Sequence, residues 1–291
     1  MLIRFFREVD YLPVSQLLNE VYRDPTRMTR WKPDRLRTEF KTRGTNPHEN
    51  CVVLEDAEGD LVGFCGYEPM AGGRALLDGP VLHQEVRGRG WGQRLWQEVS
   101  SLLKVRGIRT VSAVLGAGND RALSFLTDLG FRRDKTDVIV VNERKRQHPV
   151  EVPEGVSIRC GGDDLDPAAY EDLHSSLFAR RSLAYLGVLF RNPDYLLFTA
   201  ECQGELVGHL ELEILGEVAT IEAFGVLPDF RRRGIGKALL ARALNHAWQQ
   251  PGVDLVRQIW KTSEPGFLKV YLELGFTEKA SIHALTRILE P

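Results

Sequence analysis

The chain carries the same pattern twice, and this duplication constrains its fold more than any other feature. Three pairs of segments match in the same order: DLVGFCGYE at 60–68 with ELVGHLELE at 205–213, RGRGWG at 87–92 with RRRGIG at 231–236, and LGF at 129–131 with LGF at 274–276. The offsets are 205 − 60 = 145, 231 − 87 = 144 and 274 − 129 = 145 residues. A repeat of this length is the size of a domain, so the pattern predicts a tandem duplication.

A charged, proline-containing segment between the two copies predicts the linker. NERKRQHPVEVPEG, at 142–155, separates a Val/Ile run from a new strand that starts at Val156. Such composition is typical of an exposed connection. We therefore expect an N-terminal domain over 1–146, a linker over 147–154 and a C-terminal domain over 155–291.

Both halves alternate strand-like and helix-like segments in the same order. In the first half we expect strands near 2–6, 51–55, 61–67, 75–82, 110–115 and 138–142, and helices at 11–22, from 33, from 91 and at 121–129. In the second half we expect strands near 156–159, 196–202, 205–214, 217–226, 255–262 and 281–289, and helices within 167–191, from 235 and at 267–274. Hairpins mixed with helical crossovers indicate an α/β (α+β) fold, with a mixed sheet flanked by helices in each half.

Charge and composition argue against several classes of protein. The formal net charge is 38 − 40 = −2, which gives no electrostatic basis for binding nucleic acid or an anionic membrane. No run of 18 apolar residues and no secretory leader are visible, so we expect a cytoplasmic protein. The four cysteines lack metal-ligand spacing. The seven histidines are scattered, and we expect no metal site among them: His48, His83, His148, His174, His209, His246 and His283.

A basic glycine loop stands between a strand and a helix in each half. The shared spacing is Arg-x-x-Gly-x-Gly, formed by Arg87, Gly90 and Gly92 and by Arg231, Gly234 and Gly236. Backbone N–H groups at a helix N-terminus bind phosphate, and glycine lets phosphate oxygens approach the backbone. The two loops therefore predict two phosphate-binding sites.

Two other glycine-loop classes do not fit these residues. A dinucleotide fingerprint needs glycine or alanine three residues after the second glycine, where the chain has Leu95 and Leu239. A P-loop needs Gly-Lys followed by Ser or Thr, and the chain has none.

The segments VLHQEVRGRGWGQRL and VLPDFRRRGIGKAL resemble the coenzyme-A loop of the GNAT N-acetyltransferase superfamily. The second is closer, because Pro228 precedes the arginines where the first half has His83. The resemblance covers nearly the whole chain and implies a splayed strand before each loop, with pantetheine paired along it. It implies one acetyl-CoA per domain at most, held by Phe224, Gly225, Val226, Arg231, Arg232, Arg233, Gly234, Ile235, Gly236 and Lys237 in the second half. In the first half it implies Val81, Leu82, Arg87, Gly88, Arg89, Gly90, Trp91, Gly92, Gln93 and Asn119.

The resemblance also implies which residues perform the chemistry. Members often carry a tyrosine four residues before the Gly-Phe motif, aimed at the thioester sulfur. That position is Tyr271 in the second half and Leu126 in the first. The pantetheine-side asparagine shows the opposite pattern, with Asn119 in the first half and Glu264 in the second. Tyr271 is therefore the candidate acid, with a half-buried core aromatic as the alternative interpretation.

A carboxylate within an apolar strand is the candidate base. Glu222 lies four residues before Val226, and Asp78 occupies the equivalent place before Leu82. An acidic residue in such a strand needs a partner, a role or an exposed position at a sheet edge. The interpretations as base and as exposed edge residue carry equal weight, and we take Glu222 as the candidate base.

The sequence therefore predicts an acetyl-CoA-dependent N-acetyltransferase that acylates a primary amine of a small molecule or an amino terminus by direct attack on the thioester. The C-terminal domain is expected to be catalytic. The alternative is a non-catalytic acyl-CoA-binding or sensing protein. No metal cofactor, nucleic acid or membrane is expected, and the chain is expected to be a monomer or homodimer. Mycothiol-synthase-like tandem members of the superfamily share this architecture.

Overall fold

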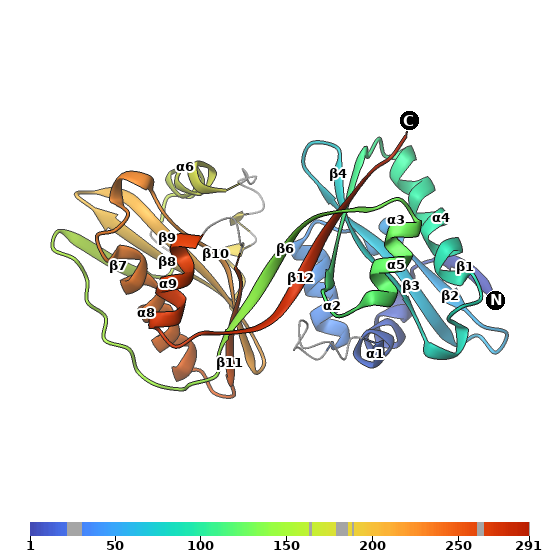
Figure 1. Ribbon diagram of the computed structural model, residues 1–291, viewed down its shortest axis with the longest axis horizontal. Coiled ribbons are helices and arrows are strands. Elements are labelled where there is room, and N and C mark those ends of the chain that lie inside the picture. Colours follow the sequence, from blue (N-terminus) through green and yellow to red (C-terminus); the bar gives the residue numbers. More distant parts are fainter. Residues whose placement is uncertain (22–30, 163–164, 179–185, 188, 261–264, 291) are drawn as a thin grey trace. The chain divides into compact units, whose positions relative to one another are not determined.

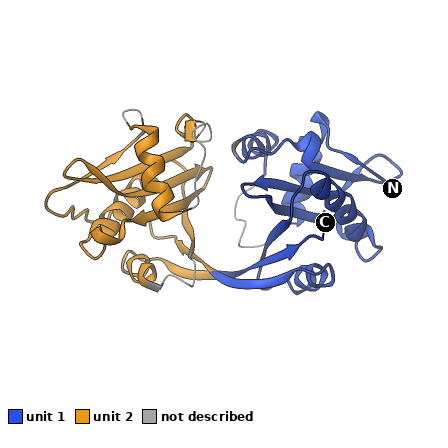
Figure 2. Cartoon of the chain, turned by 90° about the horizontal axis from the view of Figure 1, so that it is seen from above, with its two compact units in different colours: residues 1–137, 280–291 blue, residues 138–279 orange. Residues whose placement is uncertain are grey.

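The computed structural model describes residues 1–21, 31–162, 165–178, 186–187, 189–260 and 265–290. The chain divides into two compact units, which Figure 2 shows in different colours. Unit 1 comprises Met1–Asp137 and Ala280–Pro291, and unit 2 comprises Val138–Lys279.

The sheet of unit 1 has the strand order β1-β2-β3-β4-β5-β12. Its strands are β1 (Leu2–Phe5), β2 (Cys51–Glu55), β3 (Leu61–Met70), β4 (Arg74–Leu82), β5 (Thr110–Gly116) and the end of β12 (Thr277–Ile288). β4 and β5 are parallel, whereas the other neighbours in this unit are antiparallel. The parallel pair is joined through a helix, as a crossover requires.

Helices cover both faces of this sheet. They are α1 (Tyr11–Val21), α2 (Pro33–Thr42), α3 (Pro47–Asn50), α4 (Trp91–Val105) and α5 (Asp120–Asp128). On α4, Leu95, Val99 and Leu103 recur every four residues and are fully buried, which is the stripe that a helix lying on a sheet needs. They pack with residues of β2–β5, whereas α1 and α2 form a separate cluster with Val53, Phe64 and other residues of the sheet.

Unit 2 repeats this arrangement (Figure 1). Its strand order is β6-β11-β10-β9-β8-β7, with β10 and β11 parallel. The strands are β6 (Arg132–Asn142, from Val138 on), β7 (Val156–Cys160), β8 (Tyr195–Cys202), β9 (Glu205–Leu215), β10 (Val218–Val226) and β11 (Leu255–Trp260). The described helices of eight or more residues are α6 (Pro167–Leu177), α8 (Ile235–Gln249) and α9 (Pro265–Glu273).

The last strand of each half belongs to the other unit. β6 follows the N-terminal half in sequence, but its residues 138–142 pair with β11. β12 ends the C-terminal half, but residues 282–288 pair with β5. From the sequence we expected each of these strands to close the sheet of its own half. In the structure, each pairs instead with a strand of the other half. Because both halves have the same pattern, either strand could pair at the edge of either sheet. Hydrophobic periodicity alone does not indicate which sheet each strand joins.

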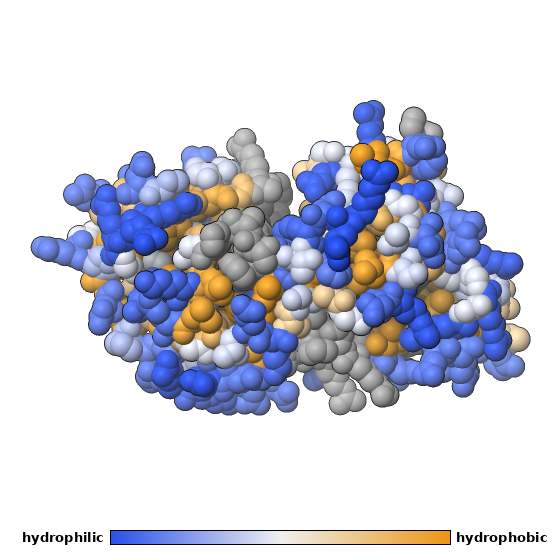
Figure 3. Space-filling model, viewed as in Figure 1, coloured by the Kyte–Doolittle hydropathy of each residue, from blue (hydrophilic) through white to orange (hydrophobic). Residues whose placement is uncertain are grey.

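The mixed α/β fold predicted for both halves is thus confirmed. No helix among the described residues is long and apolar enough to cross a membrane. Hydrophilic side chains cover much of the face in Figure 3, with apolar residues gathered in smaller patches between them.

Candidate active site

The strand before each glycine loop separates from its parallel neighbour. In unit 2, pairing between β10 and β11 runs from Val218 to Ile221, but β10 continues to Val226. In unit 1, pairing between β4 and β5 runs from Arg74 to Leu76, whereas β4 continues to Leu82. The structure therefore contains the splay in both units, and it exposes a strand edge to which an extended ligand could add.

Each glycine loop ends in a left-handed cap of the helix that follows. Gly90 is the N-cap of α4 with φ 81°, and Gly234 is the N-cap of α8 with φ 89°. A side chain is strained at such a φ, so glycine is required at both caps. Gly88–Gly90 and Arg231–Gly234 are exposed, and the first N–H groups of a 15-residue helix follow each cap glycine. This is the arrangement that binds phosphate.

The first arginine of each loop holds the loop in place. Nε of Arg87 donates to the carbonyl of Leu82 at 2.9 Å, and Nε of Arg231 donates to the carbonyl of Val226 at 2.8 Å. Each guanidinium thus ties its loop to the end of the splayed strand. This identical bond in both units explains why the arginine spacing repeats.

The second residue of the loop differs between the units. Arg232 has φ 64°, where unit 1 has Gly88 with φ 74°. A non-glycine residue in this conformation is strained by about 1–3 kcal/mol, and such strain gathers at functional sites. Lys237 forms an ion pair with Glu273 at 3.1 Å, which joins the start of α8 to the end of α9.

Tyr271 lies beside the splayed strand. It is 2% exposed on α9, and its ring meets that of Phe224 edge-on, with centroids 6.0 Å apart. The ring of Phe224 in turn lies against the loop, because a Cβ at Gly236 would stand 3.3 Å from it. The structure thus gathers the candidate acid, the splayed strand and the loop in one place.

Unit 1 lacks this arrangement. Leu126 is 6% exposed and belongs to the apolar core, so no proton donor stands at its position. The side chain of Asn119 accepts a hydrogen bond from the N–H of Ala122 and caps α5. Its predicted counterpart, Glu264, lies outside the described residues.

Glu222 is exposed and sits at a bulge. The register of β10 against β9 shifts between Ile221 and Ala223, so Glu222 is the extra residue. Bulges redirect side chains and occur beside active sites. Four residues of strand separate Glu222 from Val226, roughly 13 Å at the usual rise. An amine beside Val226 would therefore reach the Glu222 carboxylate only through a chain of several water molecules. Asp78, its counterpart in unit 1, pairs with Gly66 beside a bulge in β3.

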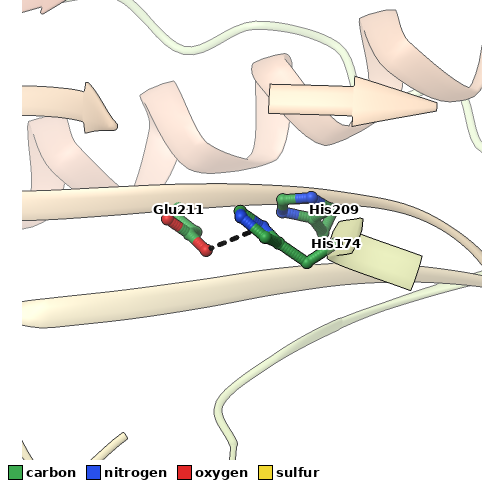
Figure 4. A group of neighbouring side chains, drawn as sticks. All are labelled: His174, His209 and Glu211. Carbon is green, nitrogen blue, oxygen red and sulfur yellow. Dashed lines mark ion pairs between the residues drawn. The ribbon is translucent and has the colours of Figure 1, made fainter. Parts of the chain in front are cut away.

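The sequence analysis missed three buried polar side chains on the face of the unit 2 sheet that α6 covers. His174 on α6 and His209 and Glu211 on β9 are each at most 2% exposed, and their ligand atoms lie within 4.8 Å of one another. Figure 4 shows the three side chains as neighbours, with a dashed line for the ion pair between His174 and Glu211. We call them the His–His–Glu cluster. The alternation His209-x-Glu211 in an apolar strand was the available signal, because such residues share a face.

The cluster adjoins the splayed strand. His209 pairs with Gly225 in the sheet, and Glu211 pairs with Ala223. A Cβ at Gly225 would lie 2.8 Å from Leu177 at the end of α6, so that helix packs directly on the glycine. The cluster therefore lies where α6 meets the strand that carries Val226.

Unit 1 holds a cavity of about 40 Å³ between α2 and strands β3 and β4. Its lining includes Glu39, Arg43, Glu68 and Asp78. Arg43 forms an ion pair with Glu39 at 2.9 Å and approaches Glu68 at 3.6 Å. Burial raises the pKa of the Glu68 carboxyl; Arg43 opposes this rise, while Glu39 and Asp78 add to it.

Comparison with known proteins finds the same family in both halves of the chain. The model of the acetyltransferase (GNAT) family matches residues 14–131 and again residues 163–276. A mycothiol acetyltransferase from Streptomyces griseus subsp. griseus is 30% identical over 287 residues, which cover 91% of this chain and 87% of that protein.

Solved structures share the tandem fold. A GCN5-related N-acetyltransferase from Sphaerobacter thermophilus superposes with a TM-score of 0.82 at 19% identity, covering 100% of this chain and 96% of that one. A tandem GNAT protein from the clavulanic acid biosynthesis pathway gives a TM-score of 0.81 at 17% identity, covering 100% and 99%. At these identities the likeness concerns the fold.

Proposed function

The chain belongs to the GNAT acetyltransferase family and is an acetyl-CoA-dependent N-acetyltransferase, and from that premise we propose that unit 2 carries its active site. The observation that supports this assignment is the position of Tyr271 beside Phe224 at the splayed strand, where unit 1 has Leu126. The comparisons give no support to a non-catalytic binding protein.

We assign the proton transfers to Glu222 and Tyr271. An acceptor amine is mostly protonated at neutral pH, so Glu222 takes its proton through water. The neutral nitrogen attacks the thioester carbonyl carbon, and the backbone N–H of Val226 stabilises the resulting oxyanion. The carbon–sulfur bond then breaks, and the leaving thiolate takes the proton of the Tyr271 hydroxyl. The positively charged nitrogen releases its extra proton to water, and the Tyr271 phenolate regains a proton from water. The products are the acetylated amine and coenzyme A.

Both units would bind coenzyme. Matched glycine caps, matched arginine bonds and matched splayed strands support a pyrophosphate site in each unit. In unit 2 the residues are Phe224–Val226 and Arg231–Lys237; in unit 1 they are Val81, Leu82, Arg87–Gln93 and Asn119. We propose up to two acetyl-CoA molecules per chain and one productive site.

The acceptor we propose is a primary amine of a small molecule. Several relatives are named mycothiol acetyltransferase, including those from Streptomyces griseus subsp. griseus and Streptomyces coelicolor. The acceptor of those enzymes is therefore the first compound to assay, followed by a panel of amino sugars, amino acids and peptides.

The base assignment is tested by Glu222→Gln, assayed by release of coenzyme A thiol across a pH series. We expect kcat/KM to fall by about 10²–10⁴ at neutral pH, because the amine loses its proton acceptor. The loss should shrink as pH rises and more of the amine is neutral in solution.

Glu217→Gln, at the turn before β10, is the matched control and should keep the wild-type pH profile. A Glu222→Gln variant with wild-type kcat/KM at every pH contradicts the assignment.

A further inference from the structure

The His–His–Glu cluster is a built site that acetyl transfer does not use. Its members come from two elements far apart in the chain, α6 and β9, yet their ligand atoms converge. Tyr170, one turn before His174 on α6, adjoins the cluster, because its hydroxyl donates to Oε1 of Glu211. All four side chains are at most 2% exposed.

The spacing between His174 and Glu211 suits a shared metal ion better than a direct hydrogen bond. Nδ1 of His174 lies 3.6 Å from Oε1 of Glu211, which is too long for a hydrogen bond. The Tyr170 hydroxyl lies 3.2 Å from Nδ1 of His209. Ligand bonds of about 2.0–2.1 Å to a tetrahedral zinc ion separate neighbouring donors by about 3.4 Å. The distance between His174 and Glu211 is close to that value, whereas Tyr170 bonds directly to Oε1 of Glu211 and supports the carboxylate from outside the ligand set.

The donor set is that of a borderline divalent metal ion. Two imidazoles and one carboxylate are established ligands for zinc and similar ions. Burial of the Glu211 carboxylate is costly unless a positive charge accompanies it. A bound divalent ion would supply that charge where α6 packs on the sheet.

Further side chains hold the proposed ligands in position, as side chains around metal ligands commonly do. Tyr195 donates to Oε2 of Glu211 and Tyr170 donates to Oε1, so both carboxylate oxygens are oriented, and Oε1 also lies near Nδ1 of His174. The ring of Phe178 packs against that of His174 in a tilted contact, with centroids 5.1 Å apart, and meets the ring of His209 edge-on. Hydrogen-bonded carboxylates and apolar shells of this kind orient ligands and exclude water.

We propose that His174, His209 and Glu211 bind one divalent transition-metal ion of the zinc class, with a water molecule in the fourth position. The ion ties α6 to β9 behind Gly225 and Val226. Its role is structural, since it lies behind the strand that would face the thioester. This inference stands apart from the assignment of Tyr271 and Glu222.

The test is metal analysis of tag-free, full-length protein produced with added zinc. We expect about one zinc per chain, and visible absorption bands of tetrahedral cobalt after exchange with Co²⁺. His209→Gln and Glu211→Gln should each reduce the metal content to a small fraction. Tyr195→Phe removes only the support of the carboxylate, so it should keep the stoichiometry and weaken binding about 10–100-fold.

Thermal unfolding separates metal binding from a merely structural effect of these substitutions. Chelation should lower the unfolding midpoint of the wild type, and Zn²⁺ should restore it, whereas neither should move the midpoint of His209→Gln. His148→Gln changes another buried histidine of unit 2 and should behave as the wild type. Wild-type protein without metal and without cobalt bands, or metal retained by both ligand variants, would overturn the proposal. The first outcome identifies the cluster as a metal-free proton-sharing network, and the second places the metal elsewhere.

Discussion

At the residue scale, the two units differ where the chemistry would occur. The sequence repeat aligns Tyr271 with Leu126, and the structure places both in apolar surroundings beside the splayed strands. A tyrosine hydroxyl can give a proton to a thiolate, and a leucine cannot. Spacing from the Gly-Phe motif was enough to find this difference, because a helix fixes which residue faces the strand.

The other site residues were less predictable. The bond from Arg231 to the carbonyl of Val226 depends on the loop's backbone path, which residue types alone do not specify. The meeting of His174 with His209 depends on how α6 crosses the sheet, 35 residues away in sequence. Local periodicity carries no information on such long-range contacts.

A pH dependence of stability follows from Glu68 in unit 1. Burial raises the pKa of its carboxyl above the value in the unfolded chain. The folded state therefore binds the Glu68 proton more tightly than the unfolded state does. The stability gained in this way is fully present below the pKa that Glu68 has in the unfolded chain. It is lost as the pH rises through the higher pKa that Glu68 has in the folded state. Glu68→Gln should thus raise the free energy of unfolding relative to wild type more at pH 7.5 than at pH 4.

Urea unfolding at both pH values measures this difference. Glu58→Gln, in the exposed turn between β2 and β3, is the control and should show the same small change at both. An equal effect of Glu68→Gln at the two pH values would contradict the expected linkage.

At the element scale, the strand–loop–helix unit is the part that the sequence predicted best. Glycine spacing predicted the helix starts, and the structure has left-handed caps at Gly90 and Gly234. The splay was implied only by resemblance, and the shortened β4–β5 and β10–β11 pairings contain it. Hydrophobic pattern specifies which residues lie inward, but not where two parallel strands part.

The cap of α8 gives a prediction for coenzyme binding. In Gly234→Ala the new Cβ would strain a residue at φ 89° and would meet Pro153 at 3.5 Å. Relief of that strain would turn the loop N–H groups away from the pyrophosphate, so we expect KM for acetyl-CoA to rise about tenfold, equivalent to ~1.4 kcal/mol, with kcat little changed.

Steady-state kinetics of thiol release provides the measurement. Gly252→Ala introduces the same strain in unit 2 at φ 86°, with no neighbour within 4 Å, and serves as the control. If Gly234→Ala and Gly252→Ala have the same KM for acetyl-CoA, the loop of unit 2 does not bind the coenzyme.

At the scale of the whole molecule, the duplication has produced two similar units that differ at the position of the proposed acid. The exchange of β6 and β12 means that residues from both halves of the sequence complete each unit. The domain limits proposed from the sequence, 1–146 and 155–291, follow the repeat, whereas the compact units divide at Asp137 and Lys279. The order of elements was predictable, but the exchange was not, because equivalent strands carry equivalent patterns.

The central claim is that one active site, in unit 2, performs the transfer with Tyr271 as the acid. The most direct test is the rate of thiol release by Tyr271→Phe at saturating acetyl-CoA and amine, beside Tyr67→Phe, which changes a buried tyrosine of unit 1. We expect Tyr271→Phe to lower kcat by about 10²–10⁴, with KM for acetyl-CoA unchanged, and Tyr67→Phe to retain wild-type kcat. A folded Tyr271→Phe variant with wild-type kcat would contradict the claim.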